Sequence, residues 1–218
     1  MILLYAVVAA DAIGPDQRGL AGNSLETIRA TLAAVVVEEC LQRPAGTEDE
    51  SRRFAEIICD LAKATPLLPV RFLTVLPTRS AVLAELQAHE AGWQRRLIDL
   101  NGLSEVVVRA RPAEADHEAD AASHAPGTSY LMSRAAAMQQ RDASIVEISE
   151  LVRDWVREIK VLRSQYGVRI ACLVSDADVS QLKDAVEDWR RAHDGSEAAV
   201  SGPWPPFSFV EPHEASSA

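Results

Sequence analysis

The sequence is poor in aromatic residues and in cysteine. Phe, Trp and Tyr make up only 5% of its 218 residues, so each ring is expected to serve packing or contact and not to act as general filler. The three cysteines, Cys40, Cys59 and Cys172, are odd in number and lie in apolar runs. This pattern argues against a disulfide framework and favours buried thiols in a reducing compartment.

Basic side chains are also scarce relative to acidic ones. The chain has 22 Lys and Arg against 32 Asp and Glu, a net charge of -10. Binding to a polyphosphate backbone needs clustered cations, so a nucleic acid is not expected as a partner, and an anionic membrane surface would repel the chain. The charge balance therefore points away from both of these partners.

Long apolar runs are absent as well. No stretch approaches the roughly 18 to 20 apolar residues that span a bilayer. The apolar start, Ile2–Ala9, lacks the preceding positive charges of a signal sequence, and Asp11 follows it closely. We expect a cytoplasmic protein with no membrane partner, in which Ile2–Ala9 is a buried strand.

Sequence signatures of catalysis are missing. No Gly-rich loop precedes a Lys-Ser or Lys-Thr pair, no Gly-x-Ser-x-Gly elbow occurs, and no cysteine lies in a known nucleophile motif. Segment 111–127 contains carboxylates and imidazoles that could bind a divalent ion, among them Glu114 and His117, but it has no apolar anchors to hold them in place. We expect it to be an exposed loop, and we expect no enzyme activity, no cofactor and no metal.

Hydrophobic periodicity predicts helices and strands in both halves of the chain. Thr47–Thr65 is predicted to be a helix that begins with a capping box between Thr47 and Glu50 and ends at Pro66. A second helix is predicted over Thr78–Leu100. Further strands are predicted at Leu25–Ile28, Thr31–Glu38, Val70–Val75, Ser104–Arg109, Val168–Val174 and Ala198–Ser201, and a short helix at Val179–Trp189.

A sustained heptad stripe runs from Leu131 to Leu162 without Gly or Pro. Its apolar positions, which include Ile148 and Trp155, predict one long helix of about 48 Å at about 1.5 Å per residue. Two interpretations remain open: the stripe covers a sheet within its own domain, or it binds a partner helix. The expected fold is α+β with two domains, an N-terminal mixed α/β domain at 1–100 and a C-terminal domain at 101–218 with the long helix.

The segment Gly202–Val210 has the most distinctive composition in the chain. Three prolines surround Trp204 and force an extended backbone with few free donors. Trp204, Phe207 and Phe209 must then be held by side-chain packing. The segment is either a strap that seals the domain core or an aromatic surface for a partner.

Several segments together resemble the gas vesicle protein F/L family. Gly202-Pro-Trp-Pro-Pro-Phe-Ser-Phe-Val210 is similar to that family's terminal Gly-Pro-Trp-Pro-Pro-Tyr-Ser-Phe-Val signature, with Phe207 in place of Tyr. Pro69-Val-Arg-Phe72 with Thr74 resembles Pro-x-Arg-Phe-Gly-Thr, with Leu73 in place of Gly. The remaining matches, in the family's order, are Gly102-x-x-Glu105 and Gly127-x-x-Tyr130-Leu131-x-x-Arg134.

The resemblance implies a gas vesicle accessory protein that binds the hydrophobic shell protein GvpA and helps vesicles to form, with other accessory proteins as further partners. It also implies a modified ferredoxin-like fold for the second domain. A sheet edge or an apolar helix face could shield such a shell subunit until it is incorporated. The residues that carry these expectations are Arg71, Phe72, Glu105, Tyr130, Arg134, Ile148, Trp155, Trp204 and Phe207.

Two other classes of function stay open on the residues alone. A ferredoxin-like scaffold hosts many functions, so a small-ligand enzyme is the first alternative. A polar pocket around His89 or Arg71 would favour it. A self-associating structural component is the second.

Overall fold

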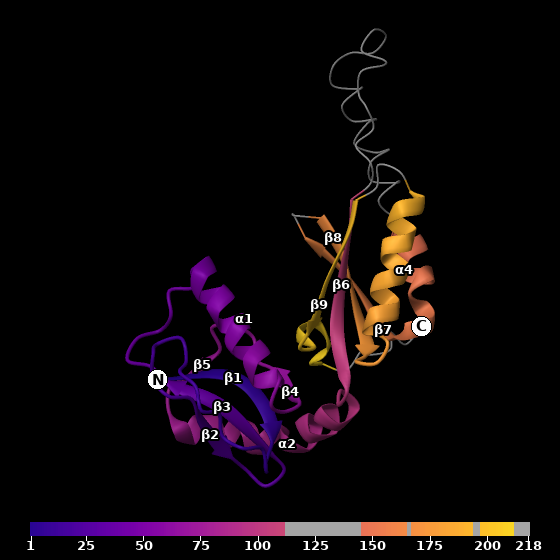
Figure 1. Ribbon diagram of the computed structural model, residues 1–218. Helices are drawn as coiled ribbons and strands as arrows, with labels where there is room; N and C mark the ends of the chain where they lie inside the picture. Colours follow the sequence, from indigo (N-terminus) through magenta and orange to yellow (C-terminus); the bar gives the residue numbers. More distant parts are fainter. Residues whose placement is uncertain (112–144, 165–166, 194–196, 212–218) are drawn as a thin grey trace. The chain divides into compact units, whose positions relative to one another are not determined.

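The computed structural model describes residues 1–111, 145–164, 167–193 and 197–211 (Figure 1). Contacts divide the chain into two compact units. Unit 1 comprises Met1–Leu103 together with Trp204–Ala218, and unit 2 comprises Ser104–Pro203. The sequence predicts that the whole segment 202–210 belongs to the C-terminal domain, whereas the contacts place the segment in unit 1 from Trp204 onward.

Unit 1 is built on an antiparallel sheet in which β1 (Ile2–Ala9) is central. One side of β1 pairs with β3 (Ala33–Glu39), which in turn pairs with β2 (Glu26–Arg29). The other side pairs with two short strands, β4 (Leu67–Pro69) and β5 (Val75–Leu76). The β-branched, apolar sequence of β1 suits this position, because a strand covered on both faces must be apolar at nearly every residue.

Two helices cover the two faces of this sheet (Figure 1). Helix α1 (Glu48–Ala62) begins with the predicted capping box between Thr47 and Glu50 and buries Phe54, Ile57, Ile58 and Leu61. Helix α2 (Arg79–Asp99) begins at the N-cap Thr78 and buries Val82, Leu86 and Leu97. Both helices follow their predictions, because the spacing of their apolar residues matches the period of a helix that lies on a sheet.

The predicted strand Val70–Val75 is wrong. The chain leaves β4 at Pro69, turns at Arg71–Thr74, and returns to β1 only at Val75. The turn is closed by the Thr74 amide, which donates to the Arg71 carbonyl at 3.1 Å. Leu73 has a φ of 67°, a value that no extended strand can contain. The β-branched and aromatic residues of this segment predicted a strand, but the backbone forms a turn at Arg71–Thr74.

Unit 2 has a second sheet with the order β7-β8-β6-β9. Its elements follow the chain as strand, helix, strand, strand, helix, strand, which is the split βαβ pattern of ferredoxin-like folds. The α+β class expected from the sequence is thereby confirmed. The elements are β6 (Leu103–Arg111), a helix at 145–151, the short 3-10 helix η1 (Arg153–Trp155), β7 (Val156–Ser164), β8 (Gly167–Ser175), α4 (Val179–Ala192) and β9 (Glu197–Trp204).

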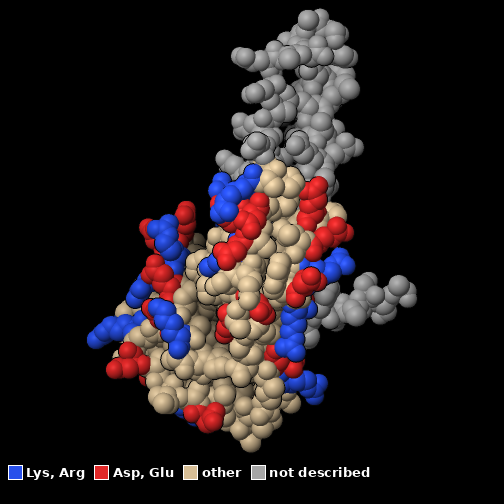
Figure 2. Space-filling view, turned by 45° about the vertical axis from the view of Figure 1, so that its right-hand side comes forward, with Lys and Arg blue, Asp and Glu red and all other residues tan. Residues whose placement is uncertain are grey.

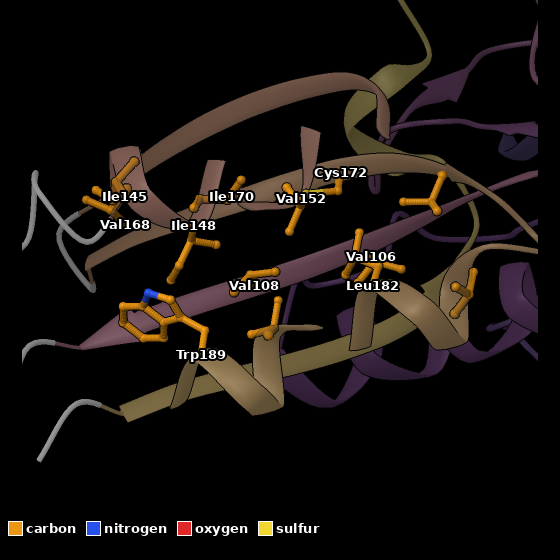
Figure 3. Packing of buried hydrophobic residues seen from close by; sticks show 13 residues of the cluster. Val106, Val108, Ile145, Ile148, Val152, Val168, Ile170, Cys172, Leu182 and Trp189 are labelled. Atoms are coloured by element: carbon orange, nitrogen blue, oxygen red, sulfur yellow. The ribbon is translucent and has the colours of Figure 1, made fainter. Parts of the chain in front are cut away.

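The core of unit 2 lies between one face of this sheet and its two helices (Figure 3). The helix at 145–151 contributes Ile148, which is fully buried, and α4 contributes Leu182 and Trp189. The sheet contributes alternate residues of β6 and β8, among them Val108 and Ile170. This packing agrees with the interpretation of the heptad stripe as cover for a sheet within its own domain.

The long helix, however, does not reach Leu162. The described helix ends at residue 151, and Val156–Ser164 forms β7, an edge strand paired antiparallel with β8. A helix would put Ile159 and Leu162 on one face, but the strand pairs Ile159 with Cys172 and Leu162 with Arg169, which point to opposite faces of the sheet. A register shift between Val156 and Glu158 changes the phase of the strand.

Candidate partner-binding surface

The C-terminal segment Trp204–Val210 is firmly held at one point. After β9 the backbone enters the 3-10 helix η2 (Phe207–Phe209), and Phe209 is fully buried. The Arg96 side chain of α2 donates from Nε and Nη2 to the Phe209 carbonyl oxygen at 2.9 and 2.5 Å. Because the donor is a charged guanidinium, these two hydrogen bonds are stronger than hydrogen bonds between neutral amides. The segment, hereafter the strap, is therefore attached to α2 near its end.

The anchored strap leaves two aromatic side chains partly in solvent. Trp204 is 41% exposed and Phe207 is 38% exposed. Pro205 and Pro206, between them, are buried, and prolines restrict the backbone on either side. The preceding Gly202 has a φ of 118°, which favours glycine. The local sequence thus fixes one buried ring, Phe209, and holds two rings toward solvent.

The second family-like motif lies in the turn between β4 and β5. Arg71 is exposed, and its carbonyl oxygen accepts bonds from the Thr74 amide and from the Thr74 hydroxyl at 2.7 Å. Phe72 is half-buried and packs against Phe54, with ring centroids 5.1 Å apart. Phe54 also stacks on Tyr5 at 4.9 Å. The motif therefore ties the turn to the core under α1 and leaves Arg71 at the surface.

A buried carboxylate that the sequence analysis did not single out holds a neighbouring loop. Glu38, at the end of β3, is fully buried. Its Oε2 accepts from the Tyr5 hydroxyl at 2.7 Å and from the Ala21 amide at 3.1 Å, while its Oε1 accepts from the Asn23 amide at 3.0 Å. The Leu20 amide donates to the Tyr5 hydroxyl at 2.8 Å. One feature of the sequence could have indicated this buried carboxylate. Glu38 and Glu39 are adjacent in a strand, so their side chains point to opposite faces of the sheet and only one of them can face solvent.

Burial changes the acidity of two groups in these cores. Desolvation raises the pKa of Tyr5 far above its usual range, and the hydrogen bond and charge of Glu38 add to the effect. In unit 2, burial raises the pKa of Cys172 to about 12, with the charge of nearby Glu105 as a second cause. Glu105, the acidic residue of the Gly102-x-x-Glu105 match, lies on β6 and is only 4% exposed. A thiol that holds its proton in this way is poorly suited to act as a nucleophile.

The remaining candidates are dispersed. Ile148 is fully buried in unit 2, so its side chain is not on a surface that a partner can touch in the folded unit. Trp155 is half-buried at the end of η1. Tyr130, Arg134 and the acidic, His-containing stretch of 111–127 beyond Arg111 lie outside the described residues. Of the candidates, Arg71 and Phe72 lie together in the turn between β4 and β5, and Trp204 and Phe207 lie together in the strap.

The described surface carries mixed charge and no assembled metal site. On the face shown in Figure 2, Lys and Arg lie among Asp and Glu, with uncharged surface between them. Within the part of the chain that the structure describes, no group of three or more His, Cys, Asp and Glu side chains could hold a metal ion. None of the described helices combines the length and the apolar character required to cross a membrane.

Comparison with known proteins places the chain in a family. A family model described as gas vesicle synthesis protein GvpL/GvpF matches residues 1–211. The chain belongs to this family. No curated protein matches it in sequence.

Two solved structures share the fold of this GvpL/GvpF protein. The gas vesicle protein GvpF from Microcystis aeruginosa is 13% identical, with a TM-score of 0.77 over 96% of this chain and 98% of that one. GvpF from Anabaena sp. PCC7120 is 16% identical, with a TM-score of 0.78 over 96% of this chain and 95% of that one. At these identities the likeness establishes the arrangement of the chain and leaves the roles of individual residues to other evidence.

Proposed function

We propose that this GvpL/GvpF protein is a gas vesicle accessory protein that binds the hydrophobic shell protein GvpA and assists vesicle formation. It acts through contact, without making or breaking covalent bonds. Other gas vesicle accessory proteins are possible further partners. The family supports a role in gas vesicle synthesis, and the exposed aromatic side chains of the strap are the proposed binding surface.

The observation that carries the proposal is the strap. Its buried Phe209 and the two bonds from Arg96 fix the backbone, while Trp204 and Phe207 remain 41% and 38% exposed. Aromatic side chains held rigidly at a surface bind an apolar partner with little loss of conformational freedom. Trp is also among the residue types that contribute most to binding energy at protein interfaces. The strap thus offers a preformed apolar contact for a hydrophobic subunit.

The experiment measures how much GvpA stays in solution when it is diluted from denaturant into the purified protein. We expect the wild type to keep GvpA dispersed. The double variant Trp204→Ser with Phe207→Ser should bind at least about tenfold more weakly, since each aromatic contact contributes on the order of 1–2 kcal/mol.

The matched control is Ile13→Ser, which removes an apolar side chain of unit 1 that is 94% exposed. It should bind GvpA like the wild type. If the wild type and the strap variant keep equal amounts of GvpA in solution, GvpA binds to a surface other than the strap. No dispersal by the wild type would refute the proposed function itself. Circular dichroism of each variant checks that the fold is retained.

A further inference from the structure

The strap and the residue before it offer a partner almost no backbone donors. Three of the five residues 203–207 are prolines and have no amide hydrogen, namely Pro203, Pro205 and Pro206. The Phe207 amide already donates to the Pro205 carbonyl oxygen at 2.7 Å. At most the Trp204 amide is left as a donor among these five residues. Strand pairing needs donors and acceptors in regular alternation, so an extended partner segment cannot pair with this backbone.

Backbone acceptors along the strap are also engaged within the chain. The carbonyl oxygens of Pro205 and Pro206 accept from amides two and three residues further on, at 2.7 and 3.0 Å. Just before the strap, the Gly202 carbonyl oxygen accepts from Lys183 Nζ at 2.7 Å. The carbonyl at the anchored end accepts from Arg96, as described above. The strap therefore presents its side chains, and not its backbone, to a partner.

The exposed side chains of the strap are large, apolar and uncharged. Trp204 and Phe207 are both partly exposed, whereas Pro205 and Pro206 between them are buried. Segment 202–210 contains no charged residue. A ligand that depends on ion pairs finds no partner in this segment, while an apolar side chain can pack against two rings. The strap thus favours contact between apolar side chains.

These properties decide which element of a partner fits the strap. A segment that displaces water from the rings must satisfy its own amide and carbonyl groups, because leaving them buried and unpaired costs free energy. The strap cannot supply the missing bonds. A helix makes its backbone hydrogen bonds within the segment, and apolar residues at three- and four-residue steps form one face of it. An apolar helix face therefore fits the strap, and an extended strand does not.

We infer that the strap receives an apolar helix of the shell protein, by side-chain contact with Trp204 and Phe207 and without strand pairing. This inference rests on the proposed function, which names the shell protein as the partner. Arg96 is a positioning residue in this interaction. It acts through the Phe209 carbonyl, and its two hydrogen bonds keep the backbone that carries both rings in one conformation. The rings then bind with little loss of conformational freedom.

The test uses the full chain and two fluorescent peptides of about 18 residues, each with the same numbers of Leu, Ala, Glu and Lys. One peptide has Leu at three- and four-residue steps, and the other has Leu at alternate positions. Fluorescence anisotropy should show at least about tenfold tighter binding of the helix-pattern peptide, and its helix content should rise on binding. Unlabelled GvpA should displace it. Trp204→Ser with Phe207→Ser should weaken its binding at least about tenfold.

Variants of α2 test the positioning role of Arg96. Arg96→Met should weaken binding of the helix-pattern peptide at least about threefold, because a loosened strap loses more conformational freedom on binding. Arg96→Lys should recover part of the affinity, since an ammonium group still donates. The matched control, Arg95→Met, removes the same charge from the exposed neighbouring position and should bind as the wild type does. When Trp204 and Phe207 are both Ser, Arg96→Met should have no further effect, which separates positioning from general destabilisation.

Three results would overturn the inference. If the strand-pattern peptide binds as tightly as the helix-pattern peptide while the wild type still keeps GvpA in solution, helix recognition is excluded and the proposed function stands. Equal affinity of the wild type and the strap variant for the helix-pattern peptide would locate the contact elsewhere. Failure of GvpA to displace this peptide would show that the shell protein does not place a helix on the strap. A wild type that does not keep GvpA in solution refutes the proposed function and the named partner, whichever peptide binds.

Discussion

Replacing Glu38 by Ala should destabilise unit 1 more than any surface substitution, because it removes the acceptor for three hydrogen bonds. The Tyr5 hydroxyl and the amides of Ala21 and Asn23 lose their partner. A hydrogen bond to a charged group contributes roughly 1.5–3 kcal/mol, but the two amides are only partly buried and water can replace some of this. We expect a loss of about 3 kcal/mol.

For a unit of this size such a loss lowers Tm by on the order of 10–20 °C. The assay is urea unfolding followed by fluorescence, with Tyr5→Phe as a milder variant that should lose about 1 kcal/mol. Retention of the wild-type midpoint by Glu38→Ala would refute the assignment of this carboxylate as the anchor of the loop.

A double-mutant cycle with Gly19 tests the same contact by a different route. A Cβ at Gly19 would lie 2.3 Å from the Glu38 carboxyl carbon, so Gly19→Ala should destabilise the wild type by about 1–3 kcal/mol through overpacking. In the Glu38→Ala background the space is free, and the same change should cost far less. Additive effects of the two substitutions would show that the two residues do not share this site.

Two further predictions concern Leu73 and Cys172. Leu73 has a φ of 67°, which is strained for any residue other than glycine. Leu73→Gly should therefore be about 1 kcal/mol more stable than Leu73→Ala, although glycine is ordinarily the less stabilising of the two residues. A higher urea midpoint for the alanine variant would contradict this strain. Burial raises the pKa of Cys172 from 9.0 to about 12, so the folded chain retains a proton that the unfolded chain releases. Stability should therefore fall between about pH 9 and 12 by up to about 1.4 kcal/mol per pH unit from this thiol. Cys172→Ala should flatten urea midpoints measured across that range, and an unchanged slope would exclude this origin.

Local sequence patterns were sufficient to predict those elements whose structure depends on nearby residues or on uniform burial. The apolar run of β1 predicted a central strand, and Thr47 with Glu50 predicted the start of α1 through a capping box that the structure contains. These signals depend on contacts within a few residues or on uniform burial. They need no knowledge of what packs against them.

Side-chain patterns predicted the wrong element at β7 and at the turn between β4 and β5. In β7, Ile159 and Leu162 have the three-residue spacing of one helix face, but the strand places them on opposite faces of the sheet. Between β4 and β5, the turn at Leu73 interrupted residues whose side chains favour strands. The pairing of β5 with β1 joins strands distant in sequence, and the spacing of side chains alone does not reveal the pairing of β7 with β8.

The sequence by itself determined the α+β class, the acidic balance and the membership of the GvpL/GvpF family, whose model matches residues 1–211, because composition, periodicity and short motifs are properties of the chain read in order. Only the tertiary structure decided which motif residues face solvent. It buried Ile148 and Phe209, left Trp204 and Phe207 partly exposed, and turned Glu38 inward onto a loop from another part of the chain. Exposure depends on the neighbours that folding supplies, and those neighbours are distant in sequence.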